Sequence, residues 1–257
     1  MVPVPGGAVL IGSNTSVCPD DEPLHEVHVD SFEIDRTEVT NAQYRDCVDH
    51  GECSPPDSPR SLTRPDYYSD PAFANFPVIN VDGDLAERYC EAVGKRLPTE
   101  AEWEKAARGG CEIGGDPSTC EPAVDARSRP WGDESPACSR ANAFRACVGD
   151  TSEVGSFPSD VSPYGAVDMG GNVAEIVNDY FRPDYYSSGE NWNPQGPSRE
   201  SADGCCGASW SGSCRVRKGD NFDGREADPT AVDRLVSCRD PVRPGEILFG
   251  LGFRCAR

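Results

Sequence analysis

Thirteen cysteines are spread along the 257 residues of this chain, and they limit its possible folds more than any other feature of the sequence. They show no paired CxxC spacing of the kind typical of zinc sites, so their number favours disulfides. Disulfides persist in oxidising compartments. We therefore expect an extracytoplasmic protein, secreted, periplasmic or surface-anchored, whose export signal has been removed. Because thirteen is an odd number, at least one thiol must be free, modified or bonded to another chain.

The composition predicts a fold with little regular secondary structure. The chain contains 26 Gly and 23 Pro, and aromatic residues make up only 8% of it. Residues 54–80, 110–165 and 183–213 show no sustained apolar period and are expected to form loops. Ordering each loop residue costs about 1–2 kcal/mol, so disulfides or bound cations must hold these segments in place. We find no internal repeat and no linker, and therefore expect one domain over residues 1–257.

Acidic residues outnumber basic residues by 44 to 24, which gives the chain a formal net charge of −20. Such a charge repels phosphate backbones and anionic lipid surfaces, and it argues against nucleic acid as a partner. It serves either solubility alone or the attraction of divalent cations. No transmembrane segment is expected, since the longest apolar stretch near the start, residues 2–11, is interrupted by two Pro and two Gly.

Two capping boxes mark helix starts. In a capping box, the side chains of two residues three positions apart each bond to the backbone N–H of the other. Here the pairs are Thr40 with Gln43 and Thr99 with Glu102. Apolar residues at helical spacing follow both pairs, so we expect a helix to begin directly after each Thr.

A third helix is predicted over residues 84–93, where Leu85, Tyr89 and Val93 would form one apolar stripe. Alternation of apolar and polar residues is typical of a strand that is buried on one face. Such short stretches predict strands at residues 26–29, 32–34 and 248–254.

Five further segments are distinctive in sequence and order. They are VPVPGGAVLIGS at residues 2–13, FEIDRTEVTNAQY at 32–44, KRLPTEAEWEKAARGG at 95–110, GAVDMGGNVAEIVND at 165–179 and GFRCAR at 252–257. Through them the chain resembles the formylglycine-generating enzyme family, also called the sulfatase-modifying factor domain, over essentially its whole length. The resemblance implies an α+β fold of C-type-lectin-like type, low in regular secondary structure, disulfide-stapled and stabilised by calcium.

Catalytic members of this family oxidise a cysteine of a sulfatase to formylglycine with two cysteines that hold copper(I) and activate dioxygen. Soft, deprotonated thiolates select copper(I), so the reaction requires this pair. The segment RVRKGD at residues 215–220 matches the approach to the pair, but Asp220 and Asn221 replace the family's Gly and Ser. No cysteine lies between Cys214 and Cys238. The two thiol positions fall on Gly224 or Glu226 and on Pro229 or Ala231.

Calcium binds six to eight oxygens from carboxylates and backbone carbonyls. For the second calcium site of the family, the resemblance implies side-chain ligands from Asp168 and Glu175 and carbonyl ligands from Gly171 and Val173. Local helix capping is the alternative explanation for part of this pattern, because Asn172 and Glu175 have capping-box spacing.

The first calcium site of the family is matched less completely. The resemblance implies Asn142 and the carbonyl of Ala143 as ligands. The family's next ligand, an Asp, falls near Ala146 or Asp150 in a loop of different length. The resemblance therefore implies only part of this site.

The cysteine pairing is partly implied by the resemblance, which matches Cys90 and Cys255 to a disulfide of the family. Cys47 and Cys53 lie close in sequence and are expected to close a small loop. Similar short loops are expected from Cys111 to Cys120 and from Cys138 to Cys147. The pairing of Cys205, Cys206, Cys214 and Cys238 stays open, and buried free thiols are the alternative.

Two functional hypotheses remain. The first is an exported, non-catalytic and calcium-stabilised scaffold without copper, which displays loops such as residues 180–192 to an unknown protein or glycan. The second is a copper-dependent oxidase that converts a sulfatase cysteine to formylglycine with displaced ligands. Ala174 and Ile176 replace two tryptophans of the family's substrate groove, which weakens the second hypothesis. His25 and His28 would point to opposite faces of a strand and so cannot share a metal.

Overall fold

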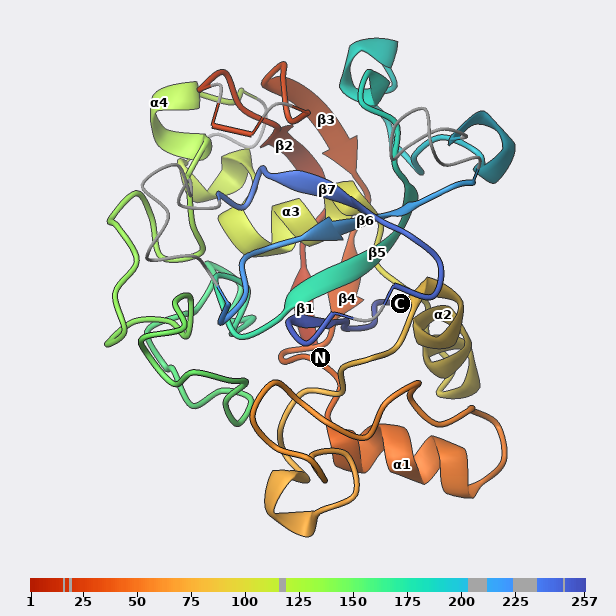
Figure 1. The fold of residues 1–257 in the computed structure, drawn as a ribbon. Helices are drawn as coiled ribbons and strands as arrows, with labels where there is room; N and C mark the ends of the chain where they lie inside the picture. The colour runs from red at the N-terminus through yellow and green to blue at the C-terminus, as the bar shows by residue number, and fades with distance from the viewer. Residues whose placement is uncertain (16, 19, 116–118, 203–211, 224–234, 247) are drawn as a thin grey trace.

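The computed structural model describes residues 1–257 except 16, 19, 116–118, 203–211, 224–234 and 247 (Figure 1). Its secondary structure is mixed and short, as expected for the α+β class. The strands are β1 Val2–Val4, β2 Gly7–Ile11, β3 His25–Val29, β4 Phe32–Ile34, β5 Ala174–Tyr180, β6 Arg215–Lys218, β7 Arg239–Val242 and β8 Leu251–Gly252. The α-helices are α1 Asn41–Asp49, α2 Gly83–Ala92, α3 Glu100–Arg108 and α4 Pro122–Asp125. Short 3-10 helices are η1 Pro71–Phe73, η2 Cys111–Ile113, η3 Tyr185–Ser188 and η4 Arg199–Ala202.

The described strands form three small sheets. β1 pairs antiparallel with β4, and β2 pairs antiparallel with β3, with Gly7 opposite Val29. The third sheet has the strand order β7-β6-β5-β8, in which β5 and β8 run parallel and the other neighbours run antiparallel. Pairing of Ala174 with Leu251 brings the C-terminal segment beside the start of β5.

Helix α3 lies between the β2–β3 pair and the four-stranded sheet, and it contacts β2, β3, β5 and β6 (Figure 1). All nine of its residues are buried, among them Trp103 and the charged Glu100, Glu104 and Arg108. Because protein covers the helix on every side, its charged groups must find partners inside the molecule.

Both predicted capping boxes are present. The hydroxyl of Thr40 accepts a hydrogen bond from the Gln43 backbone, and the Gln43 side chain accepts one from the Thr40 backbone at 2.9 Å. Thr99 and Glu102 form the same reciprocal pair. As a result, α1 and α3 begin one residue after each Thr, as expected.

Two expectations about element ends were wrong. In α2 the helix ends at Ala92, so Val93 leaves the helical spacing and is 43% exposed instead of joining the apolar stripe. The strand expected over residues 248–254 shortens to β8, because the Leu251 backbone closes a turn onto the carbonyl of Leu248, and the carbonyl of Phe253 accepts from Val39 in the loop before α1.

Disulfides tie distant parts of the chain together. The structure pairs Cys90 with Cys255 and Cys47 with Cys53, the two bonds expected first from the sequence. It also pairs Cys111 with Cys120, Cys138 with Cys147, and Cys18 with Cys238. The bond between Cys18 and Cys238 spans 220 residues and could not be assigned from sequence spacing.

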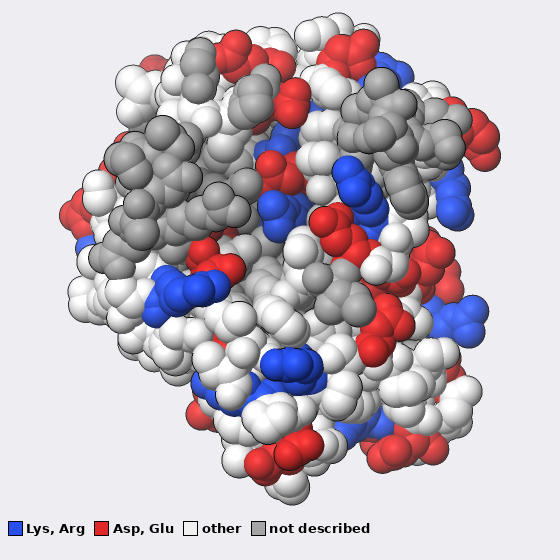
Figure 2. Space-filling view, in the orientation of Figure 1, with Lys and Arg blue, Asp and Glu red and all other residues white. Residues whose placement is uncertain are grey.

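The outer surface shows two features that bear on function. On the face in Figure 2, acidic and basic side chains lie close together at the surface. Across the described residues, no helix combines the length and the apolar character that crossing a membrane requires.

Candidate functional site

Four buried carboxylates, which we call the acidic cluster, lie around the side chain of Arg254. They are Glu38, Asp160, Asp168 and Glu175, and each of these residues is at most 2% exposed. Arg254 is fully buried and donates two hydrogen bonds of 2.7 Å to the two carboxylate oxygens of Glu175. The indole N–H of Trp103 donates a third, at 2.8 Å, to the same carboxylate.

Segments far apart in the sequence supply the acidic cluster. Glu38 lies in the loop before α1, Asp160 and Asp168 lie in the loop before β5, and Glu175 lies on β5. The carboxylate of Asp160 accepts hydrogen bonds of 3.1 Å from the backbone of Gly170. The Asn172 side chain donates to Glu38 at 2.9 Å and so links the α1 loop to the turn before β5.

The turn that carries Asp168 has an uncommon backbone. Asp168 and Asn172 both adopt the left-handed region, with φ of 59° and 65°. Asn and Asp tolerate this region better than most residues, which suits them to such a turn. A Cβ at Gly171 would lie 3.0 Å from the backbone of Asn142, so a larger residue there would push the turn away from Asn142.

Burial makes it costly in free energy for the four carboxylates of the acidic cluster to carry negative charge. It raises the pKa of Glu38 and of Asp160 well above the usual range, and the charge of Asp168 adds to both shifts. Burial also raises the pKa of Asp168, against a hydrogen bond from the Gly155 backbone. One guanidinium cannot balance four carboxylates in a buried environment. The cluster must therefore hold protons or a cation.

The residues expected for the second calcium site offer oxygens of the kind that such a cation needs, and Oε1 of Glu175, which accepts one hydrogen bond from Arg254, keeps a second lone pair. The structure places Asp168 and Glu175 in one buried acidic cluster, with Gly171 and Val173 in the turn between them. Carboxylate and carbonyl oxygens are the ligands that calcium prefers. The backbone of Asn172 donates to the carbonyl of Asn142 at 2.9 Å, so the two expected calcium sites adjoin.

The residues expected for the first calcium site of the family fit a cation only in part. Oδ1 of Asn142 is buried and has no hydrogen-bond partner among the described residues, which leaves it open to a cation, and Ala143 is buried beside it. Asp150 is engaged elsewhere, because its carboxylate accepts hydrogen bonds from Ser61, Thr63 and Thr151. Burial acts to raise the pKa of Asp150, but these hydrogen bonds outweigh it and lower the pKa.

Two residues of the acidic cluster, Glu38 and Asp160, and their partner Arg254 were missed by sequence reasoning. Glu38 and Arg254 lie inside segments that carry the family resemblance, at residues 32–44 and 252–257, but neither has a partner nearby in sequence. Asp160 lies in a long stretch without periodicity. The available signal was the presence of Glu38 and Arg254 in matched segments, and it does not reveal that these residues meet.

The structure describes the cysteines that flank the thiol site expected from the family, but not the expected thiol positions themselves. All eleven cysteines in the described part of the chain are disulfide-bonded, Cys214 and Cys238 among them. Gly224, Glu226, Pro229 and Ala231, the positions expected for the family's thiols, lie outside the described residues. Ala174 and Ile176, which replace the groove tryptophans, are 2% and 0% exposed and pack in a hydrophobic cluster on β5.

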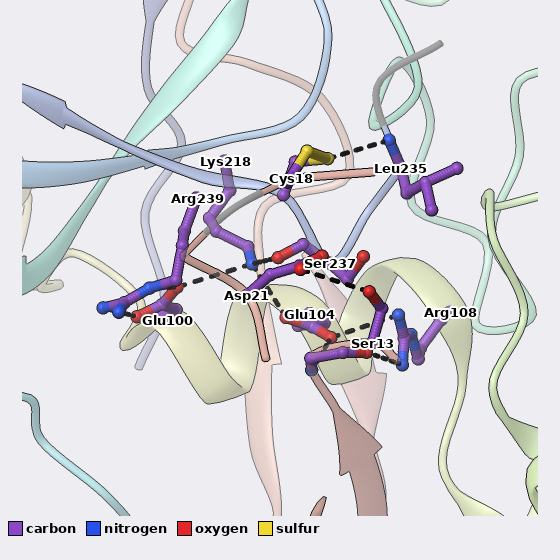
Figure 3. A network of polar contacts seen from close by, with 12 residues as sticks. Ser13, Cys18, Asp21, Glu100, Glu104, Arg108, Lys218, Leu235, Ser237 and Arg239 are labelled. Atoms are coloured by element: carbon purple, nitrogen blue, oxygen red, sulfur yellow. Dashed lines mark hydrogen bonds and ion pairs between the residues drawn. A yellow bond between two sulfur atoms is a disulfide. The ribbon is translucent and has the colours of Figure 1, made fainter. Parts of the chain in front are cut away.

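Among the described residues, one group of side chains brings its ligand atoms close enough together to hold a metal ion. Ligand atoms of Cys18, Asp21 and Cys238 all lie within 4.8 Å of one another, next to β6 and β7 (Figure 3). The two sulfurs are bonded to each other, so neither is a thiolate. In its oxidised form this group therefore offers one carboxylate and no soft ligand.

Buried ion pairs adjoin this disulfide and connect α3 to β6 and β7 (Figure 3). Arg239 donates two hydrogen bonds of 2.9 Å to Glu100, and Lys218 lies 2.7 Å from Glu104. The other carboxylate oxygen of Glu104 accepts from the Gly12 backbone at 2.8 Å. Glu100 and Glu104 of α3 are thus neutralised by bases on the sheet, and the network is suited to holding these elements together.

Comparison with known proteins identifies the family. The sulfatase-modifying factor enzyme 1-like domain matches residues 1–257. The chain belongs to the formylglycine-generating enzyme family. The formylglycine-generating enzyme of Thermomonospora curvata is 28% identical over 307 residues, which cover all of this chain and 92% of that enzyme.

Other similar proteins differ in name and size. Serine/threonine-protein kinase pkn1 of Chlamydia caviae is 33% identical over 278 residues, which cover all of this chain but 38% of the kinase. The solved structure of PvdO from Pseudomonas aeruginosa matches with a TM-score of 0.70 at 24% identity, over 99% of this chain and 92% of PvdO. The fold is therefore the C-type-lectin-like fold of the formylglycine-generating enzyme family. Membership alone does not specify an activity.

Proposed function

We propose that this member of the family is a non-catalytic, exported scaffold that is stabilised by calcium and binds a ligand through its loops. The observation that carries the proposal is the state of the described cysteines, since all eleven are in disulfides and none supplies a thiolate for copper(I). The proposed ligand is a protein or a glycan. The net charge of −20 argues against nucleic acid.

A copper titration combined with a peptide assay tests the absence of catalysis. We expect no stoichiometric uptake of copper(I) and no aldehyde, by mass spectrometry, on a cysteine-containing sulfatase peptide. The competing hypothesis is a copper-dependent oxidase that converts a sulfatase cysteine to formylglycine, and family membership favours it. One copper per chain together with peptide aldehyde would overturn our proposal. Repeating the titration after free thiols have been alkylated without reduction shows whether an unpaired cysteine binds the copper.

Calcium is the cofactor that the acidic cluster supports. Side-chain oxygens of Asp168 and Glu175 with the carbonyls of Gly171 and Val173 would hold one ion. Oδ1 of Asn142 and the carbonyl of Ala143 would contribute to a second. A bound cation would offset the buried negative charge and hold the turn before β5 in place.

Thermal unfolding with calcium or with a chelator tests this assignment. Calcium at about one hundred times its dissociation constant should stabilise the fold by about 2.7 kcal/mol, which appears as a higher unfolding midpoint. Asp168→Asn should weaken the effect, whereas Asp184→Asn, at an exposed carboxylate paired with Arg182, should not. An unfolding midpoint that is the same with calcium and with chelator would rule the site out.

The disulfides indicate a protein that is not cytosolic, because cytosolic thiols are kept reduced. We propose secretion or retention outside the cytoplasm. Cell fractionation with an antibody against the chain tests the location, and a purely cytosolic signal with reduced cysteines would contradict it.

A further inference from the structure

Trp192 is the most exposed large hydrophobic side chain among the described residues, at 64%, compared with 46% for Val148 and 44% for Val124. Tryptophan is on average well buried in folded proteins. Single exposed apolar residues are nevertheless common, and exposure alone indicates no function. Trp192 differs from such residues because neighbouring residues hold its side chain in one position.

The indole is held rigidly against β3. Its ring stacks on the imidazole of His28, with ring centroids 4.0 Å apart and an angle of 8° between the planes. Residues 191–193 form a parallel bridge to the edge of β3 that faces away from β2. The His28 backbone donates to Asn191 at 2.7 Å, and the Asn193 backbone donates to His28 at 2.8 Å. One face of the indole is therefore covered by His28, while most of the side chain remains exposed to solvent.

Side-chain contacts fix the segment on both sides of Trp192. Asn193 adopts a positive φ of 44°, and its amide forms two hydrogen bonds with Asp30, one to the backbone at 2.8 Å and one to the carboxylate at 2.9 Å. Before the tryptophan, the carboxylate of Glu190 accepts from the Tyr185 hydroxyl at 2.8 Å. An aromatic group ordered in this way loses little further freedom when a ligand binds, which favours affinity.

The charge around Trp192 selects the kind of ligand. Glu190 and Asp30 are the carboxylates that help to fix the segment, and Glu26 lies on the same face of β3 as His28, because side chains two residues apart share a face. The face of an indole ring attracts cations through its quadrupole, and carboxylates nearby add to the attraction. The net charge of −20 also steers cationic partners to the molecule.

We propose that Trp192, stacked on His28, is the docking platform for a cationic side chain from a Lys- or Arg-rich segment of a protein partner. The inference rests on the proposed binding function and names its ligand class. A guanidinium or ammonium group lies over the outer face of the indole, and carboxylates at the rim balance its charge. Arginine suits such a position well, because its planar group stacks on aromatic rings.

Isothermal titration with a hexa-arginine peptide at low salt tests the platform. Trp192→Ala should weaken binding by about threefold to thirtyfold, from the strength of cation–π contacts. Trp192→Phe should retain part of the affinity. Glu26→Gln should weaken binding modestly without changing the contacts that fix residues 190–193. Val148→Ala, at another exposed apolar side chain, serves as the matched control and should bind like the unaltered chain.

Two results would overturn the platform. One is a Trp192→Ala variant that remains folded by circular dichroism and binds hexa-arginine as tightly as the Val148→Ala control. The other is binding of a neutral oligosaccharide that depends on Trp192 while peptide binding does not, which would make the ligand a glycan. Neither result bears on the copper assay, so the platform can fail while the non-catalytic scaffold stands.

Discussion

At the scale of single residues, burial decides what a charged group contributes. Arg254 and Arg257 lie three residues apart, and each pairs with one glutamate. The Arg254–Glu175 pair is at most 1% exposed in either side chain, whereas the Arg257 side chain is 62% exposed and its partner Glu33 is 37% exposed. Water screens the Arg257–Glu33 pair but not the Arg254–Glu175 pair. Breaking the buried pair should therefore lower the free energy of unfolding much more than breaking the exposed pair.

Replacing Arg254 with Met should lower the free energy of unfolding by about 3–5 kcal/mol, because Glu175 would remain buried without its partner. The matched change Arg257→Met should cost less than about 1 kcal/mol. Urea denaturation of both variants with the disulfides intact measures the difference. Similar losses in the two variants would show that Arg254 is not the main counter-charge of the acidic cluster.

Asp179 gives a prediction about pH. Burial, with the charge of Glu100, raises its pKa from 3.8 to about 8. The folded state therefore holds this proton more tightly than the unfolded state does. As a result, this group makes the fold less stable as pH rises from about 4 to about 8, with no further change at higher pH.

The variant Asp179→Asn should flatten that pH dependence. It keeps an oxygen that can accept the 2.7 Å hydrogen bond from the Glu100 backbone, and it carries no charge to bury. We expect the variant to gain stability over the unaltered chain at pH 8, on the order of a few kcal/mol, and to differ little at pH 4. Free energies of unfolding measured across this range check the slope, and parallel curves for the two proteins would contradict the assignment.

At the scale of elements, signals contained within a few residues were reliable. The capping boxes of α1 and α3 involve residues three positions apart, so local sequence is enough to specify both helix starts. The end of α2 and the extent of β8 depend on contacts with other segments. Those two boundaries differ from the expectation.

Removing the cap of α3 should destabilise the fold. Thr99→Ala removes the hydroxyl that accepts a hydrogen bond from the Glu102 backbone, and should cost about 0.5–2 kcal/mol. Thr99→Ser keeps the hydroxyl and should recover most of the loss. Chemical denaturation of both variants provides the comparison. Equal stability of the Ala and Ser variants would mean that packing, and not the cap, determines the role of Thr99.

At the scale of the whole molecule, long-range disulfides connect a chain with little regular structure. The bond between Cys90 and Cys255 joins α2 to the C-terminal segment across 165 residues, whereas the bond between Cys47 and Cys53 spans six. A cross-link restricts the unfolded chain more when the loop that it closes is longer. The two bonds should therefore contribute unequally to stability.

Replacing both cysteines of the Cys90–Cys255 bond with Ala should cost more than the same change at Cys47 and Cys53. Loop-closure entropy gives about 5 kcal/mol for the long loop and about 2 kcal/mol for the short one. The other disulfides shorten the loop that the Cys90–Cys255 bond closes. We therefore predict only which of the two bonds contributes more to stability. Thermal and urea unfolding measure it, and a greater loss from the short-range pair would contradict the entropic account.

The sequence alone also specified part of the candidate site. Asp168, Gly171, Val173 and Glu175 were identified through a resemblance carried by contiguous residues. Their partner Arg254 lies 79 residues beyond Glu175, and no sequence pattern indicates that the two meet. Glu38 joins them from 134 residues before Asn172, the residue that contacts it.

The sequence by itself determined the family, the α+β class, the starts of α1 and α3, and the short-range disulfides, because each of these depends on residues close together or on an ordered set of matched segments. Only the tertiary structure decided which charges are buried together around Arg254, that Cys18 bonds to Cys238, and that Trp192 is held on His28 with most of its side chain exposed. The physical reason is that burial and long-range pairing depend on contacts among segments widely separated in the chain, and local sequence patterns do not encode them.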